Sequence, residues 1–223
     1  MQTYSHAIVT AVLNRPLKKW RQDNPDAIPP IRTRALMLGS LLPDLLLILI
    51  SGAVIVIDWW RGVFDNPTLQ NFDPNLPTPP ELLDLSLTIR LFDVWFFENP
   101  WVITAQNTFH SPVVLAVLIV SGYLLWKRGN VWGASLFWMA CASMLHTLID
   151  IPLHVDDGPL YLFPLNWELR YAAPISYWDP EFGGRAWSIF EHALDVVLLL
   201  WLVWTNRNWF AKGYFFGSRK RTI

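Results

Sequence analysis

The chain of 223 residues has a formal net charge of −1, and 53% of its residues are hydrophobic while only 16% are charged. Soluble domains carry about 25% charged residues, so this composition already indicates a membrane protein. The near balance of 17 basic and 18 acidic residues excludes a generally basic nucleic-acid-binding surface. The single cysteine, Cys141, excludes an internal disulfide and any zinc module built from cysteines.

Four apolar runs are long enough to cross a bilayer, at residues 35–57, 101–126, 131–153 and 186–204. The 14 tryptophans favour the same reading, because indoles gather where hydrocarbon meets water. The alternative is a soluble bundle of buried helices, but four such runs exceed what a core of this size needs. We predict one all-α domain, residues 1–223, an integral membrane bundle of about four transmembrane helices plus an N-terminal helix and an interfacial amphipathic helix.

The basic residues are distributed unevenly between the two sides of these spans. Thirteen of the 17 lie before the first span, in the turn at 127–128, or in the tail 207–223. The positive-inside rule therefore places both termini in the cytoplasm and the segments of about 58–100 and 154–185 outside.

The first outer segment begins as a loop and then becomes periodic. Thr78-Pro79-Pro80-Glu81 has the form of a capping box with proline at the helix start. The apolar residues that follow at steps of three and four predict one amphipathic helix, lying on the membrane or packed against the outer loops: Leu82, Leu85, Ile89, Phe92 and Phe96.

Ionisable residues interrupt the spans, where they are costly and usually face a protein interior or a cavity. His146 and Asp150 are four residues apart, a spacing that lets two ligands on one helix face reach one ion. His154, Asp156 and Asp157 follow directly, which favours a metal site over a capped helix terminus beside a solvated acidic loop.

Two further polar residues lie beside prolines within the apolar runs. Pro43 cannot donate a backbone hydrogen bond, so it should free the carbonyl of Gly39 and kink the span beside Asp44. An unpaired carboxylate there needs a metal, a proton or a basic partner. His110 precedes Ser111-Pro112 in the same way, although a lone histidine is more often a hydrogen-bonded core residue.

The last span carries Glu191 and Asp195 on one face, with His192 nearby. Hydrogen bonding between helices explains these residues as well as a functional role does.

Carboxylates and imidazoles without thiolates suit zinc, manganese or iron(II), and a carboxylate-rich subset suits magnesium. We expect a divalent metal, zinc first, that activates water and polarises an ester oxygen. No phosphate-binding loop, dinucleotide fingerprint or serine nucleophile elbow is present in the sequence.

The order of short motifs along the chain resembles a bacterial family of LexA-binding, inner-membrane-associated, metal-dependent hydrolases. More remotely it is similar to the zinc-dependent phospholipase C group. The segments that carry the resemblance are Ser5-His6, Leu41-Leu42-Pro43-Asp44, Thr108-Phe109-His110-Ser111, His146-Thr147-Leu148-Ile149-Asp150 and Phe163-Pro164.

By this resemblance His6, Asp44, His110, His146 and Asp150 match positions of metal ligands. Two departures stand out: Leu46 replaces a second aspartate, and Ala105-Gln106-Asn107 replaces a His-Arg-Gly triplet. His154, Asp156 or Asp157 could substitute for the missing ligands. His6 starts on the cytoplasmic side, so it can join the site only if residues 2–14 dip into the bundle.

We therefore expect a multi-pass protein of a bacterial-type inner membrane that hydrolyses a phosphoester of a lipid or an envelope metabolite. The metal set is His6, Asp44, His110, His146, Asp150, His154 and Asp156, and the catalytic set is Asp150, His154 and Asp157. The alternatives are a transporter of protons or divalent cations, which few spans and no paired halves disfavour, and a non-catalytic membrane partner protein.

Overall fold

The computed structural model describes residues 1–73 and 76–211, with side chains up to residue 207. Those residues form only helices and connecting segments, and helices make up 71% of the structure. The predicted all-α membrane bundle is thus confirmed. Residues 212–223, which include most of the predicted basic tail, lie outside the described residues.

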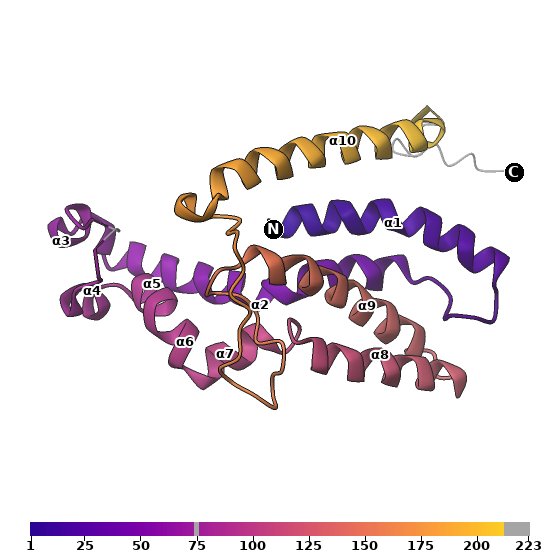
Figure 1. The fold of residues 1–223 in the computed structure, drawn as a ribbon, viewed down its shortest axis with the longest axis horizontal. Helices are drawn as coiled ribbons and strands as arrows, with labels where there is room; N and C mark the ends of the chain where they lie inside the picture. The colour runs from indigo at the N-terminus through magenta and orange to yellow at the C-terminus, as the bar shows by residue number, and fades with distance from the viewer. Residues whose placement is uncertain (74–75, 212–223) are drawn as a thin grey trace, which may run out of the picture.

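Within the described residues, six longer helices build the bundle, and shorter helical segments connect or extend them (Figure 1). The longer helices are α1 (Thr3–Asp23), α2 (Thr33–Trp60), α7 (Pro100–Asn107), α8 (Pro112–Lys127), α9 (Gly133–Asp150) and α10 (Gly184–Ala211). The short segments are η1 (Val63–Asp65), α3 (Pro67–Gln70), α4 (Pro80–Leu85), α5 (Leu87–Arg90), the π-helical η2 (Leu91–Trp95), α6 (Phe96–Glu98), η3 (Ile151–Leu153) and η4 (Pro180–Phe182).

Three of the four predicted spans are single helices of sufficient length and apolar character: α2, α9 with η3, and α10. The run predicted at 101–126 is instead a pair, α7 and α8, bent by 48°. Ser111 caps α8, with its hydroxyl accepting from the Val114 N–H, and Pro112 follows at the first helical position. Ser-Pro starts a new helix, so the run breaks at His110.

Helix α9 packs between α2 and α8, and α1 lies between α10 and α2 (Figure 1). Glycines permit the close contacts: a Cβ at Gly122 of α8 would lie 2.5 Å from the Phe137 backbone nitrogen of α9. A Cβ at Gly39 of α2 would overlap the Met139 carbonyl oxygen in the same helix α9. At these two points α9 therefore approaches α2 and α8 backbone to backbone, while Leu36 and Trp138 fill the core nearby.

The faces of α2 and α10 that point away from these contacts are apolar and exposed, including Leu49, Val56, Ile189 and Leu200. Trp59 and Trp60 end α2 and are 72% and 82% exposed. Exposed aliphatic faces with indoles at a helix end are typical of lipid contact and of the aromatic belt at a membrane surface.

The outer amphipathic helix is broken, contrary to the prediction of one continuous helix. Asp58, at the end of α2, accepts hydrogen bonds from the Ser86 hydroxyl and from the backbone N–H groups of Leu87 and Thr88. These bonds take the backbone donors that a continuous helix would use, so α4 ends at Leu85 and a new helix starts.

The predicted capping box is also absent from the described structure. Pro79 occupies the cap position of α4 with no side-chain cap. Thr78 instead donates its hydroxyl proton to Asp93 Oδ2 at 2.5 Å, which ties the loop to the π-helical segment.

Because α2 contacts α9 so closely at Gly39, we expect a side chain added at this position to destabilise the protein. Gly39→Ala should lower the free energy of unfolding by about 1–3 kcal/mol, because the added methyl group forces the helices apart. Gly52→Ala, in the same helix, meets no atom within 4 Å and should be neutral or stabilising by about 0.5–1 kcal/mol. Thermal unfolding in one detergent compares the two, and equal melting temperatures would contradict this packing.

Candidate metal centre

Asp44 is the residue around which the buried polar groups of three other segments gather. Its Oδ2 accepts a hydrogen bond from the Thr3 hydroxyl at 2.5 Å. Its Oδ1 lies 3.4 Å from His110 Nε2 and 3.3 Å from His146 Nε2. A carboxylate midway along an apolar helix is thereby satisfied by residues from α1, the α7–α8 bend and α9.

Helix α2 continues through Pro43 without interruption. Pro43 has no N–H group to donate to the carbonyl of Gly39. That carbonyl instead accepts a hydrogen bond from the Ser143 hydroxyl of α9 at 2.8 Å. The next carbonyl, Ser40, lies 2.8 Å from His146 Nδ1. Pro43 thus frees one docking point for α9 beside the carboxylate, and the Ser40 carbonyl provides a second.

His146 and Asp150 share one face of α9, as their spacing predicts, with 3.1 Å between Nε2 and Oδ2. Both histidines beside Asp44 have the same arrangement, since His110 Nδ1 lies 2.8 Å from the carbonyl of Gln106. A carbonyl oxygen can only accept, so each Nδ1 carries a proton and each Nε2 is the ring nitrogen that faces the carboxylates. This is how metal-binding imidazoles are usually oriented.

Asp44, His110, His146 and Asp150 offer four ligand atoms that all lie within 4.8 Å of one another. Ligand atoms that share one ion at about 2 Å are less than about 4 Å apart, so the contacts of 3.1–3.4 Å fit a common ion. In the described part of the chain no hydrogen bond ends at His146 Nε2, although this atom is buried. A cation between the imidazoles and carboxylates would satisfy it, so these residues can hold a metal.

His6 lies beside this group and contacts Asp150. Its Nε2 is 3.0 Å from Asp150 Oδ1, and its ring stacks on that of His146 with 3.6 Å between centroids. The Met1 amino group pairs with the same oxygen at 2.8 Å. Residues at the start of α1 therefore enter the bundle, and the structure places His6 where it supports Asp150.

His154 forms a separate pair at the mouth of the site instead of joining the four ligands. Its Nδ1 lies 2.9 Å from Asp157 Oδ1, and Trp178 Nε1 donates to Asp157 Oδ2 at 2.8 Å. Burial raises the pKa of Asp157, but these hydrogen bonds outweigh it and leave the pKa below its usual value. An ionised Asp157 holds the proton on His154 Nδ1, which leaves Nε2 to exchange protons. Asp156 is exposed and outside this pair.

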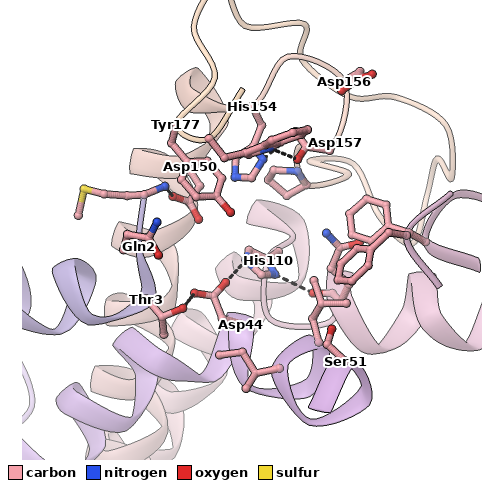
Figure 2. Close-up of a pocket in the computed structure, with 18 of the residues that line it drawn as sticks. Gln2, Thr3, Asp44, Ser51, His110, Asp150, His154, Asp156, Asp157 and Tyr177 are labelled. Atoms are coloured by element: carbon pink, nitrogen blue, oxygen red, sulfur yellow. Dashed lines mark hydrogen bonds and ion pairs between the residues drawn. The ribbon is translucent and has the colours of Figure 1, made fainter. Parts of the chain in front are cut away.

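A cavity of about 1000 Å³ joins the two groups. Figure 2 shows Asp44 and His110 facing one another on one side of it, with Asp150, His154 and Tyr177 on another. Burial raises the pKa of Tyr177 well above its usual value, so its hydroxyl stays protonated. Among the described residues that line this cavity are five carboxylates and no lysine or arginine: Asp44, Asp93, Asp150, Asp156 and Asp157.

The carboxylates of α10 bind α1 rather than the candidate centre. Asp195 accepts from the Ser5 hydroxyl at 2.7 Å, and Glu191 accepts from the Gln2 N–H at 2.6 Å and from Trp187 Nε1 at 3.0 Å. His192 is exposed and lies 3.2 Å from the Tyr4 hydroxyl. Glu191 and Asp195 thus take part in hydrogen bonding between helices, which is one of the two interpretations that the sequence allowed for them.

Sequence reasoning missed the residues that orient the site. Thr3 donates to Asp44, and the carbonyls of Ser40 and Gln106 bond the imidazoles of His146 and His110. Ser143 acts on the backbone of α2 instead, because its hydroxyl donates to the Gly39 carbonyl. Only the carbonyl freed by Pro43 left a signal in the sequence, because the other partners are ordinary residues brought close by folding.

No family model, no curated protein and no solved structure matches this chain. The functional interpretation therefore depends on the residues of the site.

The geometry predicts which histidine holds metal. His146→Ala should lower metal affinity by more than about 100-fold, since loss of a residue that merely orients a ligand already costs about 10–100-fold. His192→Ala removes an exposed imidazole that lies 3.2 Å from the Tyr4 hydroxyl, away from the candidate centre, and should retain wild-type metal content. Elemental analysis of the detergent-purified variants measures both, and equal metal in all three proteins would rule out this centre.

Proposed function

We propose that the protein is a membrane-embedded, metal-dependent hydrolase that cleaves a phosphoester of a lipid or an envelope metabolite. The observation that carries the proposal is the convergence of two aspartates and two histidines on one buried point at the wall of a large cavity. The resemblance to metal-dependent hydrolases of the bacterial inner membrane points in the same direction.

The donor set of two imidazoles and two carboxylates favours zinc, with manganese, iron(II) and magnesium as alternatives. Asp44, His110, His146 and Asp150 hold the ion, which when bound lowers the pKa of a water and polarises a phosphoryl oxygen. The absence of lysine and arginine from the described lining also supports a metal, because an anionic phosphate would otherwise be repelled by five carboxylates.

Proton transfer belongs to the His154–Asp157 pair. Hydrolysis forms a P–O bond from water and breaks the P–O bond to an alcohol, whose oxygen then needs a proton. His154 lines the same cavity as Asp150, and Asp157 fixes its tautomer. An oriented histidine of this kind contributes about 10²–10⁴-fold to a rate as a general acid or base.

We place both termini in the cytoplasm of a bacterial-type inner membrane, with the cavity towards the outer side. The excess of basic residues at one end of the bundle supports this orientation. Reporter fusions should give cytoplasmic signals at residues 30 and 128 and an external signal at residue 165. A cytoplasmic signal at residue 165 would reverse the orientation.

The hydrolase proposal makes a prediction about activity. Purified protein should release product from a panel of phosphoesters, and a chelator should abolish this release. Asp150→Asn keeps the side-chain volume but removes the charge, so it should lower kcat by at least about 100-fold while the protein stays folded. His192→Ala serves as the matched control. Retained cleavage in the presence of chelator would contradict metal-dependent catalysis.

Cation transport is the second candidate, favoured by the acidic lining of the cavity. Protein that binds metal, cleaves no ester and gives liposomes an Asp44-dependent cation or proton flux would establish transport in place of hydrolysis.

A further inference from the structure

Part of the cavity wall is apolar. It consists of one face of α2 and of side chains from the π-helical segment and α6, among them Ile48, Ile55, Phe92 and Phe97. We propose that this wall binds the acyl chain of a lipid whose ester lies at Asp44, a step that rests on the hydrolase function and names its substrate class.

The depth of the site favours such an amphiphile. Asp44 is about 16 Å along α2 from Thr33 and about 24 Å from Trp60, at 1.5 Å per residue. The hydrocarbon core is about 30 Å thick, so the candidate metal centre lies within it. A lipid keeps its acyl chain in hydrocarbon and needs to move only its headgroup inward to reach this depth, whereas a soluble ester would have to leave water completely.

The wall is open to a ligand along its length. Ile48, Ile55, Phe92 and Phe97 are 50%, 43%, 43% and 44% exposed, although all four line the cavity. From Leu47 to Ile55 the wall extends about 12 Å along α2. An acyl chain would cover these side chains, while a small water-soluble ester would leave them uncovered.

Gly52 lies in the middle of this wall and opens it further. A Cβ built there meets no atom within 4 Å, even though α2 is packed closely against α9 at Gly39. A glycine facing open space inside a transmembrane helix lets a ligand approach the backbone closely.

The apolar wall is connected to the proton-transfer pair through Arg170. Its guanidinium lies 5.3 Å from the Phe96 ring centroid and 5.4 Å from that of Phe97, and it also hydrogen-bonds the Gly158 carbonyl. Gly158 directly follows Asp157 in the outer loop. The same loop therefore positions the apolar wall and the His154–Asp157 pair around one cavity.

Photolabelling tests the proposal without relying on catalysis. The probe is phosphatidic acid with a diazirine in its acyl chain, added to the full-length protein in nanodiscs, with labelled peptides mapped by mass spectrometry. In wild-type protein the label should concentrate on peptides with Ile48, Ile55 and Phe92. Gly52→Leu should lower this labelling about tenfold, the effect of excluding about two methylene groups from an apolar site.

Ala53→Leu is the matched control, because Ala53 is the exposed neighbour of Gly52 and does not line the cavity. It should label like wild type. Both substitutions introduce a good helix former, so neither should prevent folding. Labelling spread equally over other lipid-facing surfaces such as Ile189, or labelling that Gly52→Leu leaves unchanged, would overturn the proposal.

Hydrolysis assays separate this inference from the function on which it rests. For Gly52→Leu, the ratio of phosphatidic acid cleavage to p-nitrophenyl phosphate cleavage should fall about tenfold. If no ester is cleaved even by wild-type protein but Gly52-dependent labelling is found, the hydrolase function fails and the acyl-chain site stands. If both esters are cleaved with an unchanged ratio, the acyl-chain site fails and the hydrolase function stands.

Discussion

A carboxylate in the middle of a membrane-crossing helix must find partners, because burying an ionised group alone in hydrocarbon is prohibitively costly. Asp44 meets this requirement through Thr3, His110 and His146, which come from three separate parts of the chain. Each of these parts is drawn into the bundle at the same depth. The polar contacts of this one side chain depend on three features of the fold. These are the position of α1, the bend between α7 and α8, and the register of α9 against α2.

Backbone carbonyls then convert a cluster of polar residues into a candidate metal centre. The carbonyls of Ser40 and Gln106 accept from the Nδ1 atoms of His146 and His110, which directs both Nε2 atoms towards the carboxylates. Two carboxylates that face two imidazole Nε2 atoms need positive charge between them, which a bound metal ion or protons on the imidazoles can supply. The bend that ends α7 and the register of α9 against α2 are therefore part of the ligand geometry as well as of the fold.

The sequence predicted what depends on local spacing and apolar run length. It placed His146 and Asp150 on one face, and it identified Asp44 and His110 as polar residues that an apolar environment would not leave unpaired. It did not predict that Asp58 would break the outer amphipathic helix at Ser86, because these residues are 28 positions apart and only folding brings them together. The local sequence pattern also could not predict the contact of His6 with Asp150, because that contact depends on where α1 packs.

X-ray absorption spectroscopy of the zinc-loaded protein tests the central claim most directly, because it reports the atoms bound to the ion. If Asp44, His110, His146 and Asp150 share one ion, the spectrum should show nitrogen and oxygen ligands at about 2.0–2.2 Å with the outer-shell scattering of two imidazoles. His110→Ala should reduce the imidazole contribution to one ring. A spectrum with sulfur ligation, or with oxygen ligands and no imidazole scattering, would contradict the account.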